Sequence, residues 1–201
     1  LFATPSFAAT TTDTSTLASA DTYLEKDVPD TTHNSTVFCI GYETGADVID
    51  RTLFRFTTPA LAGTIVSTKI FFYNYYSAAN ALALNMETHT ATRTTWTEAG
   101  ATWNKYDGTN NWTSAGGDFS STIISSLAQG TASGLWRTFC LDSGSGCTTN
   151  PITVSWNTQY DFLFKTITEA NAQNVECFRS KEYATVNQRP YVEIIYTPPF
   201  S

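Results

Sequence analysis

Three tryptophans, Trp96, Trp103 and Trp112, fall within 17 positions of one another. The polar side chains interleaved with them are Glu98, Asn104 and Asp107. An exposed aromatic ring binds a sugar by stacking on its apolar face, while carboxylates and amides nearby grip the hydroxyls. Alternatively, the rings anchor a long irregular loop, because tryptophan buries a large area and needs only one polar contact. We expect Trp112, in the polar stretch GTNNWTSAGG, to be the exposed platform, and we favour anchoring for Trp96 and Trp103.

Basic side chains offer a second kind of site. Arg51 and Arg55 share one face of an apolar strand, where a guanidinium usually pairs with a carboxylate, and we name Glu182 and Asp21 as partners. The functional alternative is a basic cleft for an acidic polysaccharide such as alginate. Its members would be Arg51, Arg55, Lys181 and Arg189. The net charge of −7 disfavours this cleft, because electrostatic steering favours ligands of opposite sign.

The sequence lacks a motif that would indicate catalysis. A pair of carboxylates such as Glu98 and Asp107, or His89 with a tyrosine, could act as acid and base, but nothing singles these residues out. Neither a G-x-S-x-G elbow nor a phosphate-binding loop occurs. We therefore expect a protein that is not an enzyme.

A structural calcium ion is the one cofactor that the sequence suggests. Calcium prefers carboxylate and carbonyl oxygens, and Asp21, Asp47 and Asp50 are loose candidates whose spacing matches no recognisable calcium loop. Zinc is not expected, because there is no C-x₂-C pair and His33 and His89 stand alone.

The four cysteines, an even number, indicate an oxidising compartment. Cys140 and Cys147 bracket the turn-rich stretch LDSGSG, which favours a local disulfide. Cys39 and Cys177, each in an apolar strand-like run, would then pair across the sheet. The alternative is four reduced cysteines packed as small hydrophobic side chains.

A low content of charged residues marks the whole chain. Charged residues make up 14% of its 201 positions, against about 25% in typical soluble domains. The acidic balance argues against nucleic acid as a partner, and no apolar run approaches the roughly 20 residues of a membrane span. We expect a secreted protein of the cell surface or a biofilm matrix. Two sequons, at Asn34 and Asn111, predict surface loops that could carry N-linked glycan.

Short strands account for nearly all of the chain after residue 17. Nine segments are rich in β-branched and aromatic residues or alternate between apolar and polar ones, with turn signals between them. They are residues 36–42, 51–57, 67–76, 81–90, 135–141, 152–156, 160–166, 174–180 and 191–197. Residues 121–128 are a weak helix candidate that could equally form a strand. The pattern predicts an all-β fold with two packed antiparallel sheets, a β-sandwich of jelly-roll type.

Four blocks follow one another along the domain. They are ASADTYL (18–24), RTLFRF (51–56), TTWTEAGATWNKYDG (94–108) and FRSKEYATVNQRPYVEIIYT (178–197). Together they resemble the DNRLRE domain family, also described as disaggregatase-related, which overlaps alginate-type carbohydrate-binding modules. The resemblance spans residues 17–197 and implies a secreted jelly-roll domain without catalysis of its own. It also implies that Trp96 and Trp103 belong to the framework of the domain.

Residues 1–16, LFATPSFAATTTDTST, lie outside that resemblance and form an extended leader. Such a segment becomes ordered only by packing on something, because ordering costs about 1–2 kcal/mol of backbone entropy per residue. Leu1, Phe2 and Phe7 could dock on a neighbouring copy and add a strand to its sheet, with residues 10–16 as the connector. We therefore expect a leader (1–16, a donated strand or linker), a jelly-roll domain (17–197) and a C-terminal tail (198–201).

A head-to-tail contact that does not close into a ring produces a filament. The sequence thus predicts a non-catalytic, self-assembling subunit of an extracellular or cell-surface filament, whose partners are copies of itself. The alternative is a carbohydrate-binding module for an extracellular polysaccharide, which could be acidic. Its binding residues would be Trp112, Trp96, Trp103, Arg51, Lys181 and Arg189.

Overall fold

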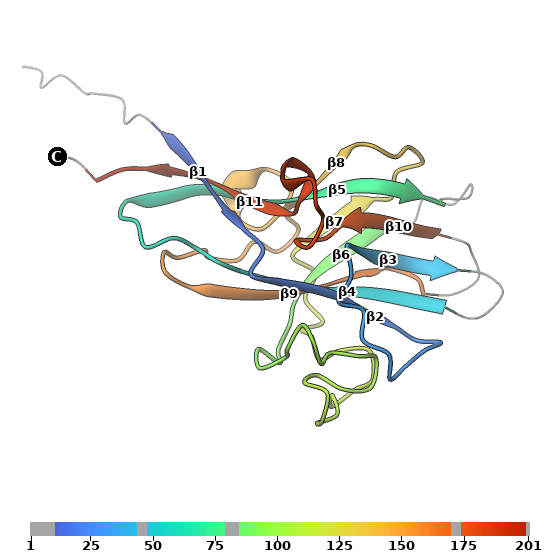
Figure 1. Cartoon of the computed structure of the whole chain (residues 1–201). Coiled ribbons are helices and arrows are strands. Elements are labelled where there is room, and N and C mark those ends of the chain that lie inside the picture. Colours follow the sequence, from blue (N-terminus) through green and yellow to red (C-terminus); the bar gives the residue numbers. More distant parts are fainter. Residues whose placement is uncertain (1–10, 44–47, 79–84, 170–173, 200–201) are drawn as a thin grey trace, which may run out of the picture.

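The computed structural model describes residues 11–43, 48–78, 85–169 and 174–199, which form an all-β domain (Figure 1). In chain order the strands are β1 (Thr12–Leu17), β2 (Ala20–Glu25), β3 (Val37–Glu43), β4 (Val48–Thr57), β5 (Thr64–Ser77), β6 (Asn85–Thr90), β7 (Ser125–Ala128), β8 (Trp136–Cys140), β9 (Gln159–Thr166), β10 (Asn174–Arg179) and β11 (Tyr191–Thr197). Within these ranges the helical segments are two 3-10 turns, η1 (Ser143–Ser145) and η2 (Val186–Gln188). None of the described residues belongs to a helix that is long and apolar enough to cross a membrane.

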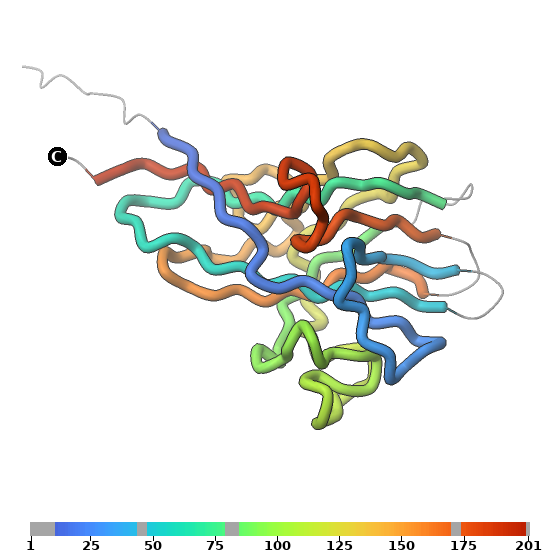
Figure 2. The backbone as a smooth tube through the Cα atoms, viewed as in Figure 1, coloured from blue at the N-terminus to red at the C-terminus, as the bar shows by residue number. Residues whose placement is uncertain are grey.

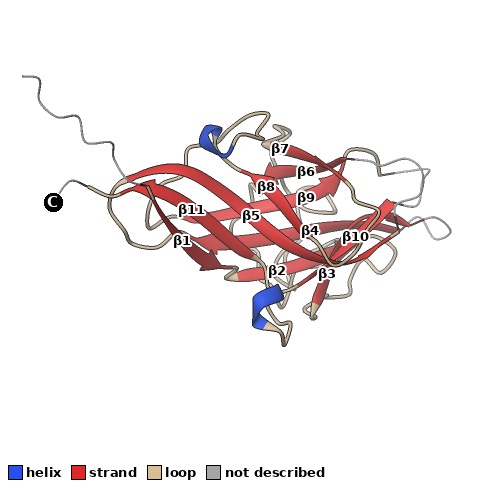
Figure 3. Ribbon diagram, turned by 90° about the horizontal axis from the view of Figure 1, so that it is seen from above, coloured by secondary structure: helices blue, strands red, loops and turns tan. Residues whose placement is uncertain are grey.

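The strands form one antiparallel sheet that curls around a core (Figure 3). Their order is β1-β11-β5-β10-β3-β4-β9-β6-β7, with β2 paired to β4 and β8 paired to β5. The 14-residue strand β5 joins the two parts of the sheet, because it pairs with β11 and β8 along most of its length and with β10 at its end. The predicted all-β class is confirmed. The division into a two-sheet jelly-roll sandwich stays a prediction.

Phenylalanine rings fill the inner side of the curled sheet, with Phe72 of β5 at their centre. Five rings have centroids 4.9–5.5 Å from that of Phe72. They belong to Phe38, Phe54, Phe139, Phe164 and Phe178. All six side chains are buried and come from β3, β4, β5, β8, β9 and β10. Aromatic side chains bury about 150–250 Å² each, so this cluster supplies much of the apolar area that closes the sheet.

A second core lies on the outer side of β2, β4 and β9, beneath the long connection formed by residues 91–124. Figure 2 shows this connection as the green loop that hangs below these strands. Its tryptophans pack against apolar side chains that the strands direct outwards, including Leu53 of β4 and Leu163 of β9. The indole N–H of Trp112 donates to the Thr102 carbonyl at 2.8 Å, so the one polar group of the ring is satisfied.

The placement of Trp112 corrects the sequence prediction of an exposed platform. Its side chain is only 5% exposed, and Trp96 and Trp103 are buried beside it. The polar residues around Trp112 in the sequence lie at the surface of the loop, while the ring itself turns inwards. All three tryptophans therefore anchor the loop, and none presents a face on which a sugar could stack.

Two predictions of local structure change, and one that the sequence left open is decided. Residues 152–156 form no strand, because the Ser155 N–H donates to the Tyr160 hydroxyl at 2.8 Å instead of to a neighbouring strand. The weak helix candidate at 121–128 contains strand β7. Strand β1 pairs along its full length with β11 of the same chain, so residues 12–16 are the first strand of the domain and not a connector to another subunit.

Both predicted disulfides are present. Cys39 of β3 and Cys177 of β10 are register partners in adjacent strands, and their bond links residues 138 positions apart. Cys140 and Cys147 close the short loop that contains η1. The two bonds are compatible with an extracellular protein.

The anchoring of the loop predicts a large loss of stability in Trp112→Ala. Replacing a buried tryptophan by alanine removes packing worth about 3–5 kcal/mol of unfolding free energy. Trp136→Ala, at a side chain that is 37% exposed, is the matched control and should cost less than half as much. Urea unfolding monitored by circular dichroism measures both. Equal unfolding midpoints for the two variants would show that Trp112 does not anchor the loop.

Candidate functional site

Four aromatic side chains form a row on the outer side of β5, β8 and β11. We call Phe71, Tyr73, Trp136 and Tyr191 the aromatic face. Alternation along β5 places them there, because Phe72 points into the core and its two neighbours point the other way. The register pairs Tyr73 with Trp136 and Phe71 with Tyr191, which brings the four rings together across three strands.

The rings of the aromatic face contact one another. Phe71 and Tyr191 stack with centroids 4.7 Å apart and an interplanar angle of 3°. The Trp136 ring lies 5.2 Å from both Tyr73 and Tyr191 and is turned by 77° and 80° against them. Trp136 is the most exposed of the four, and the other three are half-buried. The arrangement holds a tryptophan in a fixed orientation at the surface of the sheet.

A cavity of about 640 Å³ opens to solvent between Arg51 of β4 and the two ends of the loop formed by residues 91–124. Small polar side chains line it together with Arg51, Arg93 and Phe119. Arg51 is held by the protein itself: its Nε and Nη2 donate to the two carboxylate oxygens of Glu169 at 2.7 Å each, and its Nη1 donates to a backbone carbonyl. The Arg51 guanidinium therefore pairs with a carboxylate of the same chain, as the sequence favoured, and is not free for the alternative acidic ligand.

The other residues of the expected basic cleft are also paired internally. Arg55 donates to Asp161 at 2.7 Å, and Arg189 donates to a backbone carbonyl at 2.7 Å. Lys181 contacts Glu98 at 2.9 Å and also contacts Glu182. The predicted partners of Arg51 and Arg55 were wrong. Arg55 pairs with Asp161 because the two residues are register partners on β4 and β9, which the sequence does not reveal.

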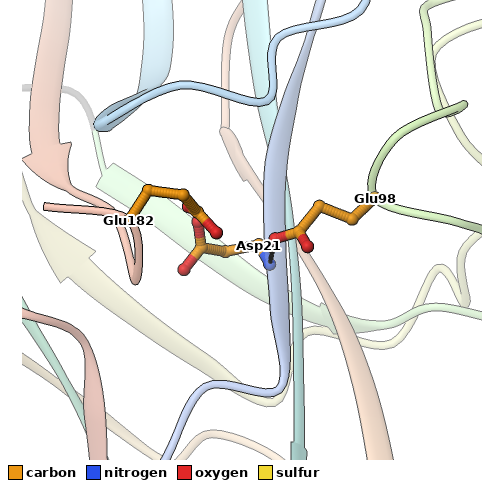
Figure 4. Close-up of side chains that lie close together, drawn as sticks. All are labelled: Asp21, Glu98 and Glu182. Atoms are coloured by element: carbon orange, nitrogen blue, oxygen red, sulfur yellow. Dashed lines mark hydrogen bonds between the residues drawn. The ribbon is translucent and has the colours of Figure 1, made fainter.

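Three carboxylates, those of Asp21, Glu98 and Glu182, lie close together beside β2, and we call them the carboxylate cluster (Figure 4). One oxygen of each lies within 4.8 Å of the others. Asp21 is only 2% exposed, and burial raises the pKa of its carboxyl well above the ordinary value, against the opposing effect of the Lys181 N–H bond. Of the expected calcium ligands, Asp21 belongs to this cluster and Asp47 lies outside the described residues.

Asp50, the third expected calcium ligand, lies elsewhere and faces Glu25 across β2 and β4. Burial raises the pKa of Asp50 to about 8, and Glu25, Glu43 and Asp27 add to the rise. Burial, together with Asp27, raises the pKa of Glu25 to about 7. His33 lies with its Nε2 3.1 Å from Glu25, and burial lowers the pKa of this imidazole. Both carboxyls therefore bind a proton more tightly in the fold than at their ordinary pKa values.

Two further sets of predicted sites are the glycosylation sequons and the subunit-interface residues. Asn34 and Asn111 are both exposed, so glycosylation at either sequon stays a prediction that the fold permits. The proposed interface residues Leu1, Phe2 and Phe7 lie outside the described residues.

No family model matches the chain, and no match is found among curated proteins. The resemblance to the DNRLRE family therefore stays a prediction.

The Asp50 and Glu25 pair predicts that the protein loses stability as the pH rises. Both carboxyls bind a proton more tightly in the folded chain than at their ordinary pKa values of 3.8 and 4.5. The free energy of unfolding therefore falls between about pH 4 and pH 8. We expect a higher melting temperature at pH 5 than at pH 9. In Asp50→Asn the melting temperature should depend less steeply on pH. Asp13→Asn, at an exposed site on β1, should keep the slope of the parent. An unchanged slope in Asp50→Asn would refute the assignment.

Proposed function

We propose that this protein is a non-catalytic, extracellular glycan-binding domain and that the aromatic face is its binding surface. The observation that carries the proposal is the exposed ring of Trp136, held between Tyr73 and Tyr191 on the outer side of the sheet. A fixed and accessible ring is what stacking on the apolar face of a sugar requires. Because the ring is already ordered, binding loses little side-chain entropy.

Polar groups beside the rings complete such a surface. The hydroxyls of Tyr73 and Tyr191 can donate to or accept from sugar hydroxyls. Lys69 and Glu193 are register partners two residues along β5 and β11 from the stacked pair, so they lie on the same side of the sheet. They provide one donor and one acceptor at the edge of the aromatic row.

A neutral glycan suits this surface better than an acidic one. Arg51, Arg55 and Lys181, the members of the alternative basic cleft, are paired with carboxylates of the same chain. The net charge of −7 repels a polyanion at low ionic strength. The aromatic face carries a cation and an anion side by side, so its local charge is balanced.

Trp136→Ala is expected to weaken glycan binding about tenfold, which corresponds to about 1.4 kcal/mol for the loss of one stacked ring. Glycan arrays identify a ligand, and retardation in gels that contain neutral or acidic polysaccharide gives the affinities. The matched control is Ile167→Ala, which removes a 54% exposed apolar side chain that follows β9. Equal retardation of parent and Trp136→Ala, or binding to acidic gels alone, would contradict the proposal.

Filament formation is a second proposal, favoured by the position of β1 at one end of the strand order. An edge strand has unpaired backbone groups and can accept a strand from another chain. Residues 1–10 directly precede this edge, and they are the segment that would be donated to a neighbouring subunit.

Deleting residues 1–10 separates this second proposal from the first. The domain should still fold, because β1 begins at Thr12, and its glycan binding should be unchanged. Electron microscopy of the full chain and of the deletion variant then reports assembly. Filaments that form only with the full chain would support the donated strand, and filaments of the deletion variant would refute it.

A further inference from the structure

The carboxylate cluster joins three segments that are far apart in the sequence. Asp21 is on β2, Glu98 is in the loop formed by residues 91–124, and Glu182 is in the connection between β10 and β11 (Figure 4). In the part of the chain that the structure describes, it is the one group of His, Cys, Asp or Glu side chains whose atoms converge closely enough to hold a metal ion.

One oxygen of each carboxylate is fixed by a donor of the protein. Asp21 Oδ2 accepts from the Lys181 N–H at 2.9 Å, and Glu98 Oε1 accepts from the Asp21 N–H at 2.9 Å. Glu182 Oε2 accepts from the Ser180 hydroxyl at 3.0 Å. These bonds orient the three groups and leave the second oxygen of each for another partner.

The second oxygens of the two glutamates share one ammonium, and the second oxygen of Asp21 has no partner. Glu98 Oε2 lies 2.9 Å from the Lys181 ammonium, which also contacts Glu182 Oε1. Asp21 Oδ1 has no hydrogen-bond partner, and the side chain that carries it is only 2% exposed. An unpaired buried carboxylate oxygen is costly, so this atom indicates that a positive partner is missing from the arrangement.

We propose that Asp21, Glu98 and Glu182 bind a calcium ion, and that the Lys181 ammonium occupies part of this site when calcium is absent. Calcium takes oxygen ligands at about 2.3–2.6 Å, so two of its ligands can lie up to about 5.2 Å apart. Magnesium, at about 2.0–2.1 Å, requires oxygens within about 4.2 Å. The three oxygens lie within 4.8 Å of one another, so small side-chain adjustments after the ammonium leaves would let one calcium ion reach all three, whereas the tighter octahedral geometry of magnesium fits them less well.

Lys181 is placed so that it can leave. Its side chain is 26% exposed, and a four-carbon stem can carry the ammonium into solvent when a divalent ion arrives. Three carboxylates and one ammonium carry a net charge of −2 when all are ionised. This charge attracts a divalent cation.

Calcium binding at this site would stabilise the fold. An ion that binds the folded chain and not the unfolded one raises the unfolding free energy by mass action. It would fasten the loop that contains Trp96 and the connection that contains Glu182 to strand β2. The inference is independent of the aromatic face, which lies on β5, β8 and β11.

The test uses the full chain after dialysis against EDTA. Isothermal titration calorimetry with CaCl₂ to about 10 mM covers the roughly 10⁻⁴–10⁻³ M affinities of extracellular calcium modules. We expect saturable binding, a rise in melting temperature with CaCl₂ and a smaller rise with MgCl₂. Glu98→Gln and Glu182→Gln should weaken calcium binding at least tenfold, and Asp13→Asn should leave it unchanged.

Lys181→Met is the decisive variant. Removing the competing ammonium should tighten calcium binding about tenfold, since a nearby unit charge is worth more than 1.4 kcal/mol in a partly buried site. If this variant fails to fold in EDTA, its recovery by CaCl₂ and not by MgCl₂ supports the site equally. Absence of heat and of a melting shift in both the parent and the Lys181→Met chain overturns the proposal, as does equal binding by Glu98→Gln.

Discussion

The outer part of the structure depends on the hydrogen bonds that the Asp161 carboxylate accepts. Its Oδ1 accepts from the Trp96 indole N–H at 2.6 Å and from Arg55 Nε at 2.7 Å, and its Oδ2 accepts from Gln159 at 2.8 Å. The Arg55 guanidinium in turn lies 4.3 Å from the Trp96 ring centroid and donates to the Thr94 carbonyl. A buried carboxylate is tolerated because all of this pairing is in place, and the pairing fixes where the loop of residues 91–124 begins its path over the sheet. The cavity and the position of Glu98 both follow from that path.

The two outer sides of the curled sheet differ in how deeply their apolar side chains are buried. Leu53 and Leu163 point outwards from β4 and β9 and are covered by the loop of the same chain. Phe71 and Tyr191 also point outwards, from β5 and β11, but they remain half-buried, with Trp136 exposed beside them. A sheet that needed these rings only for stability would bury them, as β4 and β9 do with their leucines. Their partial exposure in a contiguous row is typical of a surface that binds something.

Local pattern predicted most of the strands, because alternation and β-branched residues are properties of single segments. What it could not predict depends on register and on distant segments. In the run KIFFYNYY apolar residues occupy both sides of β5, so the pattern alone does not say which rings face outwards, and the aromatic face was missed. The ion pair of Arg55 with Asp161 follows from the register of β4 and β9. Asp21 was named as a metal ligand from sequence, but its neighbours in the cluster come from segments 77 and 161 positions away and leave no local signal.

The distribution of positive charge links these observations to function. The chain has 11 basic residues against 18 acidic ones. Several of the basic side chains form ion pairs between segments that are distant in the sequence. Arg51 holds Glu169 from a distance of 118 residues, and Arg137 lies 3.0 Å from the buried Glu176. Each of these cations is the counterion of a buried or half-buried carboxylate, and diverting it to an external anion would leave that carboxylate unpaired. The glycan that we propose as ligand would therefore have to bind without taking these cations, and stacking on the rings of β5, β8 and β11 would meet that condition.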